Sequence, residues 1–92
     1  MSCRVRLVPR ARREFVALHK ALRDRIGARI DALADDPCPP DSEHLTGKLR
    51  MYGRLRVGDY RVCYTVDDVT RRVTIAEIGH RGRAYDDLER RA

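Results

Sequence analysis

The spacing of the apolar residues changes near Met51, and this change constrains the fold of the 92-residue chain more than any other feature. Before that point apolar residues recur every three or four positions, which is the period of one face of an α-helix. After it they alternate with polar residues, which is the period of a half-buried β-strand. A chain that is helical first and extended later is expected to pack its helices on one face of a mostly antiparallel sheet, so the sequence predicts an α+β fold.

Two amphipathic helices are predicted in the first half, joined as a hairpin, after an opening strand over residues 3–8. Pro9 occupies a position that suits the first turn of a helix. A polar break between the two helices is expected between His19 and Asp24, and Pro37 ends the second helix. The stretch from Cys38 to Lys48 is predicted to be a loop. The apolar residues that define the two helices are Ala11, Phe15, Leu18 and Leu22, and then Ile26, Ile30 and Leu33.

Three strands in a meander are predicted in the second half. Gly58-Asp59 suits a two-residue hairpin turn of type II′, because glycine accepts the positive φ that its first central position requires. The third strand, from Arg72 to Ile78, loses its alternation near Glu77, which indicates a β-bulge. The charged tail from Ala84 to Ala92 is expected to form a short helix or to fray. Residues 1–92 are predicted to form a single domain.

The two-residue turn determines which side chains of the hairpin share a face, because successive side chains of a strand point to opposite sides. It places Arg56 opposite Arg61 and Leu55 opposite Val62. One side is then the predicted core side and carries Leu55, Val57, Tyr60, Val62, Tyr64 and Val66. The other side carries Tyr52, Arg54, Arg56, Arg61, Cys63 and Thr65.

The second side gathers three arginines on one face of the hairpin, and this arrangement has a cost in stability. Like charges directly opposite one another on a sheet are destabilising, and a domain of this size has little stability to give up. Phosphate is the usual anion that benefits from such a cluster, and Tyr52 adds an aromatic plane beside Arg54. Arginines with an aromatic ring are typical of surfaces that hold single-stranded nucleic acid. A solvated basic face, or one matched to acidic residues of a protein partner, explains the pattern equally well.

The composition limits which partners the protein can have and in which cellular compartment it is expected. The net charge of +6 favours a polyanion or an acidic protein. The sequence contains no apolar run long enough to span a membrane and no secretory signal at its start, so a cytoplasmic protein is expected. The three cysteines lack the spacing of a metal site and are interpreted as reduced thiols, Cys63 as a small buried hydrophobe. Neither a metal nor a nucleotide cofactor is expected.

The segment Gly58-Asp59-Tyr60-Arg61-Val62-Cys63-Tyr64, followed by Ile78-Gly79-His80-Arg81 and Tyr85, resembles the signature of RelE-type toxins in the RelE/ParE superfamily. The upstream segment Leu45-Thr46-Gly47-Lys48-Leu49 is similar to the one that leads into the sheet of that family. The predicted helical hairpin also fits, so the resemblance covers nearly the whole chain. It implies a RelE-like fold.

The resemblance also implies a function. RelE-type toxins are metal-independent endoribonucleases, or mRNA interferases, that cut messenger RNA in the ribosomal A site and so inhibit translation. The ribose 2′-hydroxyl attacks the adjacent phosphate, which requires a base, cations for the phosphorane charge and an acid for the leaving oxygen. A cognate antitoxin protein is implied as the partner, in a toxin–antitoxin hetero-oligomer.

Four residues of the chain match catalytic positions of the family. Arg61 matches the arginine that stabilises the phosphate, Arg81 the one that protonates the leaving group, and Tyr85 the tyrosine that orients or stacks on the substrate. Arg54 falls where well-studied members carry a lysine, and Tyr52 where some carry another. Because arginine stays protonated, Arg54 is a poor base but can neutralise phosphate.

A second group of residues contains the candidates for the general base and for substrate binding. The base is His80, Tyr85 or no side chain at all, and a histidine hydrogen-bonded to backbone at a strand end is the alternative interpretation of His80. Arg56 and Lys48 join Tyr52 and His80 as expected substrate-binding residues. Basic positions on the helices, such as Arg12, Arg13 and Arg25, are interpreted first as a solvated face and second as contacts to ribosomal RNA.

Two other functions remain open. One is a ParE-like toxin that poisons DNA gyrase, which the retention of Arg61, Arg81 and Tyr85 disfavours. The other is a catalytically weakened toxin that mainly binds its antitoxin, which the missing lysines favour.

Overall fold

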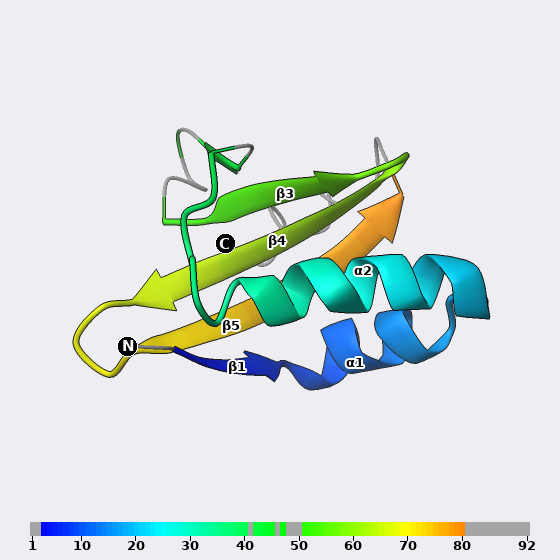
Figure 1. Cartoon of the computed structure of the whole chain (residues 1–92), viewed down its shortest axis with the longest axis horizontal. Coiled ribbons are helices and arrows are strands. Elements are labelled where there is room, and N and C mark those ends of the chain that lie inside the picture. Colours follow the sequence, from blue (N-terminus) through cyan, green and yellow to red (C-terminus); the bar gives the residue numbers. More distant parts are fainter. Residues whose placement is uncertain (1–2, 41, 46, 48–50, 81–92) are drawn as a thin grey trace.

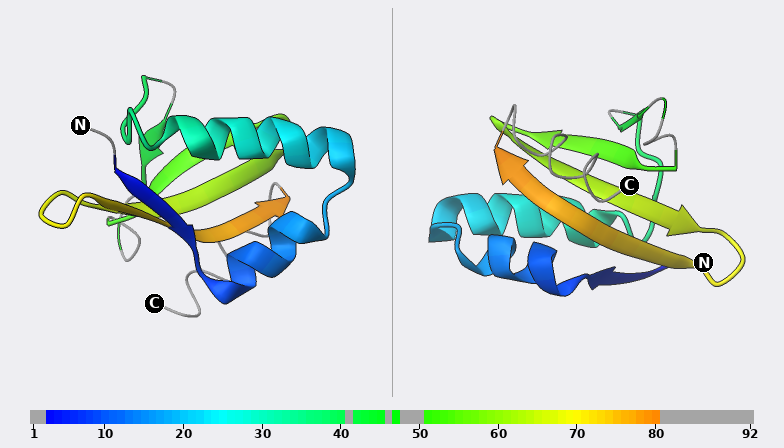
Figure 2. Two further views of the ribbon diagram at one scale, coloured as in Figure 1. Left: turned by 60° about the horizontal axis from the view of Figure 1, so that its bottom comes forward. Right: turned by 180° about the vertical axis from the view of Figure 1, so that it is seen from behind.

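The computed structural model describes residues 3–40, 42–45, 47 and 51–80 of the chain. The elements are β1 (Arg4–Leu7), α1 (Pro9–Val16), α2 (Lys20–Ala32), β2 (Glu43–His44), β3 (Gly53–Val57), β4 (Tyr60–Asp67) and β5 (Arg72–His80). They form a five-stranded sheet in the order β1-β5-β4-β3-β2 (Figure 1). Viewed from behind, the sheet lies in front of both helices (Figure 2). The predicted α+β fold is confirmed, and the predicted tail at 84–92 lies outside the described residues.

The two helices begin and end close to the predicted positions, except at the break between them. Pro9 stands in the first turn of α1, as predicted. The break lies at 17–19 and overlaps the expected stretch only at His19, which is the extended residue that precedes α2. The polar residues that suggested a later break belong to the exposed surface of α2, where Lys20 and Asp24 form an ion pair of 2.8 Å one turn apart. No helix in the described part of the chain is long and apolar enough to cross a membrane.

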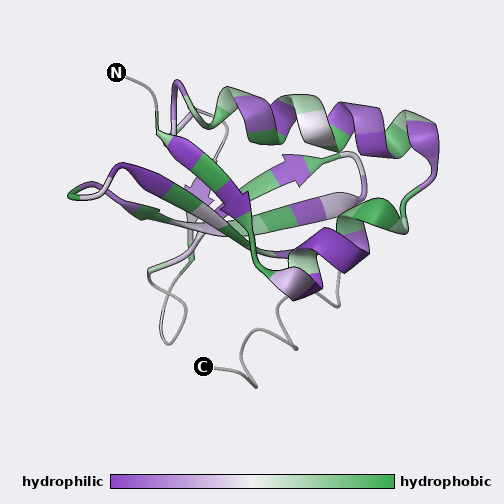
Figure 3. Ribbon diagram, turned by 90° about the horizontal axis from the view of Figure 1, so that it is seen from below, coloured by the Kyte–Doolittle hydropathy of each residue, from purple (hydrophilic) through white to green (hydrophobic). Residues whose placement is uncertain are grey.

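The core lies between α2 and the sheet. Leu55, Val62 and Tyr64, which the alternation assigns to the core side of the hairpin, are buried, while Tyr60 and Val66 pack at the rim of the core. The alternation is visible along the strands as bands of hydrophilic and hydrophobic residues (Figure 3). The members of the core that are themselves buried are Ala11, Ile26, Ile30, Leu33, Leu55, Val57, Val62, Tyr64, Val73, Ile75 and Ile78.

The pairing of β3 with β4 has the predicted register. Val57 pairs with Tyr60 and Arg56 with Arg61, so that Gly58 and Asp59 form a two-residue turn. Gly58 has a φ of 59°, the positive value that the first central position of a type II′ turn needs. The other pairings add what the sequence did not predict: β1 runs parallel to β5, and β2 is a two-residue antiparallel strand within the predicted loop.

The predicted bulge is present in β5. Cys63 pairs with Glu77 while its neighbour Tyr64 pairs with Ile75, so Ala76 is the extra residue. The insertion shifts the alternation by one position. As a result Ile75 and Ile78 both point into the core, and Glu77 falls on the opposite face.

Helix α1 closes the edge of β5 beyond the end of β1. The parallel pairing stops at Leu7 and Ile75. Further along, the backbone N–H of Ile78 donates a hydrogen bond of 3.1 Å to Oε1 of Glu14, and Arg10 Nε lies 3.6 Å from the other carboxylate oxygen of Glu14. A side chain of α1 therefore satisfies an edge donor that would otherwise invite another strand.

We expect Gly53→Ala to destabilise the protein. A Cβ at this position would lie 2.8 Å from Cζ of the buried Tyr64 ring, its cross-strand partner. The free energy of unfolding should fall by about 1–3 kcal/mol, as for other overpacked sites, measured by urea denaturation. In a Tyr64→Leu background the same substitution should cost much less; an equal cost in both backgrounds would show that the ring does not lie over Gly53.

We expect Glu14→Ala to destabilise the edge of β5. Without the carboxylate the Ile78 N–H loses its acceptor, which should lower the free energy of unfolding by about 1–3 kcal/mol. Hydrogen exchange of the Ile78 amide should accelerate, whereas Glu14→Gln, which keeps an acceptor oxygen, should protect it better than alanine. Unchanged exchange in Glu14→Ala would contradict this contact.

Candidate nucleic-acid interface

Three arginines occupy the sheet face that points away from α2. Arg54 and Arg56 belong to β3, and Arg61 belongs to β4 directly opposite Arg56. Directly opposed residues have Cβ atoms about 4.5–5.5 Å apart, so two arginine side chains leave the sheet from neighbouring points. Arg56 is exposed and Arg61 half-buried. We call Arg54, Arg56 and Arg61 the arginine face.

A row of residues that crosses four strands runs beside the Arg56–Arg61 pair. It joins Glu43 on β2, Arg54 on β3, Cys63 on β4 and Glu77 on β5. Nη2 of Arg54 donates a hydrogen bond to Oε2 of Glu43. Because the Glu43 side chain is 65% exposed, this ion pair contributes little energy, and an anionic ligand can compete with Glu43 for Arg54.

A buried carboxylate lies in this row. Glu77 is 1% exposed, and its Oε1 atom lies 3.4 Å from Nη2 of Arg10, which reaches it from α1. Burying a carboxylate is costly unless cations or donors compensate it. Glu77 therefore links α1 to the floor of the arginine face. Glu77 is not among the predicted site residues, and the interrupted alternation near this position is the sequence signal for it.

Cys63 is completely buried and is the neutral centre of the same row. Burial, and next the negative charge of Glu77, raise the pKa of its thiol to about 12, while the charges of Arg54 and Arg61 act in the opposite direction. A thiol with such a pKa is not a nucleophile at neutral pH. It fills space under Leu45, Tyr52 and Ala76, which confirms its interpretation as a small buried hydrophobe.

The structure brings part of the predicted site together. Tyr52 packs on Cys63 and is half-buried, so its ring adjoins the arginine face. Three of the predicted site residues, Lys48, Arg81 and Tyr85, lie outside the described residues. Within the described part of the chain no three His, Cys, Asp or Glu side chains gather as a metal site would require.

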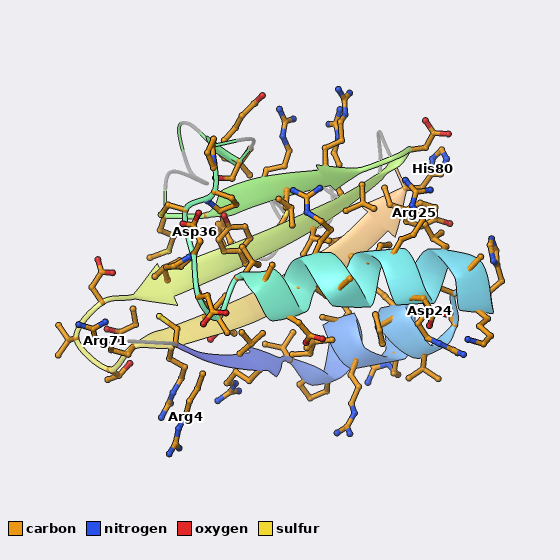
Figure 4. The ribbon with its side chains drawn as sticks, viewed as in Figure 1. Arg4, Asp24, Arg25, Asp36, Arg71 and His80 are labelled. Carbon is orange, nitrogen blue, oxygen red and sulfur yellow. The ribbon has the colours of Figure 1, made fainter. Side chains whose placement is uncertain are left out.

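His80 does not lie on the arginine face. His80 ends β5 and pairs with Tyr60. The two rings meet edge to face, with centroids 5.4 Å apart and planes at 84°. Because of the bulge at Ala76, His80 shares its side of the sheet with Ile78 and α2. It lies near Arg25 at one end of the molecule (Figure 4).

Comparison with known protein families finds one family model that matches this chain. The family model for the ParE toxin of the type II toxin–antitoxin system parDE matches residues 5–85. The chain belongs to this toxin family. It is thus a type II toxin of the RelE/ParE superfamily, and the predicted kinship is confirmed.

Solved structures support the same assignment. The toxin is 32% identical to a chain of the archaeal RelE–RelB complex from Pyrococcus horikoshii, with a TM-score of 0.78 over 91% of this chain and 100% of that one. It is 26% identical to a chain of the RelBE2 toxin–antitoxin complex from Mycobacterium tuberculosis, with a TM-score of 0.79 over 88% and 100%. The isolated RelE toxin of Escherichia coli, 19% identical, shares the fold, with a TM-score of 0.77 over 98% of each chain. Comparison with curated proteins gives no match.

We expect Cys63 to resist thiol reagents in the folded toxin. With its pKa raised from 9.0 to about 12, the thiolate fraction at about pH 8 should be roughly a thousandfold smaller than that of an ordinary cysteine. The exposed Cys38 should react at once, and Cys63 only after denaturation, as mass spectrometry of labelled peptides would show. Because folding raises this pKa, the neutral thiol of Cys63 contributes to the free energy of unfolding. That contribution is fully present below pH 9.0 and is lost as the pH rises toward 12. Rapid labelling of native Cys63 would contradict its burial.

Proposed function

We propose that this toxin is a metal-independent endoribonuclease that cuts messenger RNA on the ribosome, and that a cognate antitoxin restrains it. The observation that carries the proposal is the direct opposition of Arg56 and Arg61 beside Arg54 on one face of the sheet. Tyr52 supplies an aromatic ring at the same place. The family resemblance adds Arg81 and Tyr85 to this set as the proposed acid and the proposed substrate-orienting residue.

Cationic side chains can speed this reaction by stabilising the negative charge that develops in its transition state. When the 2′-oxygen bonds to phosphorus, the phosphoryl oxygens gain charge, and donors already in place stabilise it without reorganising. Guanidinium groups suit this task because each offers five N–H donors in a planar fork that matches two phosphate oxygens. A phosphate that binds between Arg56 and Arg61, which pair directly across the two strands, is attracted by both guanidinium groups.

The proposed reaction balances without water or a cofactor. The bond between phosphorus and the 5′-oxygen breaks as the bond to the 2′-oxygen forms, which leaves a 2′,3′-cyclic phosphate and a 5′-hydroxyl. The 2′-hydroxyl loses its proton and the leaving 5′-oxygen gains one. Since arginine stays protonated, the described arginine face acts by charge stabilisation and does not supply the base.

Two solved structures that resemble this chain support an antitoxin as its partner. The Pyrococcus horikoshii and Mycobacterium tuberculosis chains were both solved in toxin–antitoxin complexes. We propose that this toxin likewise forms a hetero-oligomer with an antitoxin, and that acidic residues of the antitoxin offset its charge of +6. The complex would reside in the cytoplasm, where ribosomes and messenger RNA are found.

Two alternatives each have an observation in their favour. A ParE-like toxin that poisons DNA gyrase is favoured by the family model, which describes a ParE toxin. A catalytically weakened toxin that mainly binds its antitoxin is favoured by Arg54, whose charge is shared with Glu43 and which cannot act as a base.

We expect Arg61→Ala to abolish most of the cleavage. In a purified bacterial translation system the wild type should cut messenger RNA within codons and leave 5′-hydroxyl ends. Loss of one positioned transition-state donor should slow cleavage about 10²–10³-fold, as primer extension over time would show. Arg61→Lys, which keeps the charge, should retain more activity than Arg61→Ala, and Arg4→Gln, at the far end of the sheet, should cut like the wild type.

Thermal denaturation of each variant separates lost catalysis from lost folding. Intact message with the wild type, in a system where translation continues, would overturn the nuclease proposal. Trapping of cleaved plasmid DNA in a gyrase supercoiling assay would then establish the gyrase alternative.

A further inference from the structure

A shallow basic groove lies where α2 passes the tip of the β3–β4 hairpin. Its volume is about 330 Å³, and it is lined by Arg25, Ala28, Arg29, Arg56, Val57 and Gly58. Half of these residues are arginines and none is acidic. We call this the hairpin groove.

The groove is accessible because the sheet edge is open there. Strand β2 pairs only with Gly53 and Arg54 of β3, so in the described part of the chain no strand continues along Arg56 and Val57 on that side. The backbone edge of β3 therefore forms one wall of the groove and α2 forms the other.

The arginines of the groove are placed for an anion from outside. The guanidinium of Arg25 lies over the hairpin turn, with its nitrogens 3.8 and 3.9 Å from the point where a Cβ on Gly58 would stand. Among the described residues neither Arg25 nor Arg56 takes part in an ion pair. Arg29 follows Arg25 by one helical turn, so the two side chains leave α2 on the same face.

The hairpin groove is continuous with the arginine face. Arg56 lines the groove and also stands opposite Arg61 on the sheet. Positive charge therefore extends from the face of the sheet, past the outer edge of β3, to the side covered by α2. Figure 4 shows Arg25 at this end of the molecule, while Arg4 and Arg71 lie at the other end.

We propose that the hairpin groove binds a phosphodiester group of the RNA strand that the arginine face holds, at a nucleotide away from the cut. The proposal rests on the proposed function, because it assumes the same RNA ligand. Phosphate is favoured over a protein segment because three of the six lining residues are arginines, with their paired donors, and none is acidic. Ala28 and Val57 offer little apolar surface to a docking helix.

The test measures binding rather than cleavage. The probe is a fluorescent single-stranded oligonucleotide with 2′-O-methyl riboses, which lacks the attacking hydroxyl and cannot be cut. Anisotropy titrations over a range of salt concentrations compare Arg25→Gln and Arg25→Gln/Arg29→Gln with the wild type. Arg4→Gln and Arg4→Gln/Arg71→Gln are matched controls that remove the same charge at the opposite end of the molecule.

Each groove arginine that contacts phosphate should contribute about 0.7 to the slope of log affinity against log salt. At 0.1 M salt its removal should weaken binding about fivefold, and the double groove variant should lose about 25-fold. The control variants should keep the wild-type slope and lose less than about twofold. All variants should retain the wild-type circular dichroism spectrum and melting temperature.

Three outcomes would overturn the proposal. One is equal loss in groove and control variants, which would mean unspecific attraction. Another is wild-type RNA affinity in the groove variants together with weakened antitoxin binding, which would make the groove a protein site. The third is a wild type that does not bind the oligonucleotide. A groove effect in a toxin that cuts no message would instead overturn the nuclease function and leave the groove in place.

Discussion

The two-residue turn at Gly58 and Asp59 is the constraint on which the rest of the sheet depends. With no spare residue in the turn, the pairing of β3 with β4 has one register, and a shift by one position would turn every side chain to the wrong face. Leu55, Val62 and Tyr64 then enter the core together. For the same reason Arg56 and Arg61 are placed opposite each other on the other side.

Buried side chains lie beside the arginine face and pack under it. The neutral thiol of Cys63 and the buried carboxylate of Glu77 fill the row beside Arg56 and Arg61. Arg10 compensates Glu77 from α1, and Glu14 of the same helix satisfies the backbone of Ile78. Helix α1 thus holds both the edge of β5 and the buried carboxylate beside the arginine face.

The hairpin was predictable from the sequence because its signals are local. Turn chemistry at Gly58 and alternation from Leu55 to Val66 sufficed to determine the register and both faces. The parallel contact of β1 with β5 was not predictable, since it joins residues such as Val5 and Val73 across the whole chain. Glu43 on β2 was missed as a partner of Arg54 because a two-residue strand has too few positions to show a period.

The candidate site was predictable in part, for a physical reason. Tyr52, Arg54, Arg56 and Arg61 follow from alternation on two adjacent strands. The side chains of Glu77 and His80 follow the bulge at Ala76, which reverses the alternation after Ile75, and the sequence located that irregularity without fixing the extra residue. Family resemblance supplied residue roles, but which face a side chain occupies depends on strand pairing. For that reason His80 matches the family motif and still packs on Tyr60, on the side of α2.

The central claim is that RNA phosphate binds where arginines converge at the hairpin. The most direct measurement is a nuclear magnetic resonance titration of the arginine Nε–Hε signals of the toxin with an uncleavable 2′-O-methyl oligonucleotide. We expect the signals of Arg56, Arg61 and Arg25 to shift saturably, while those of Arg4 and Arg71 stay in place. Unchanged signals for Arg56 and Arg61, or shifts concentrated at Arg4 and Arg71, would contradict the claim.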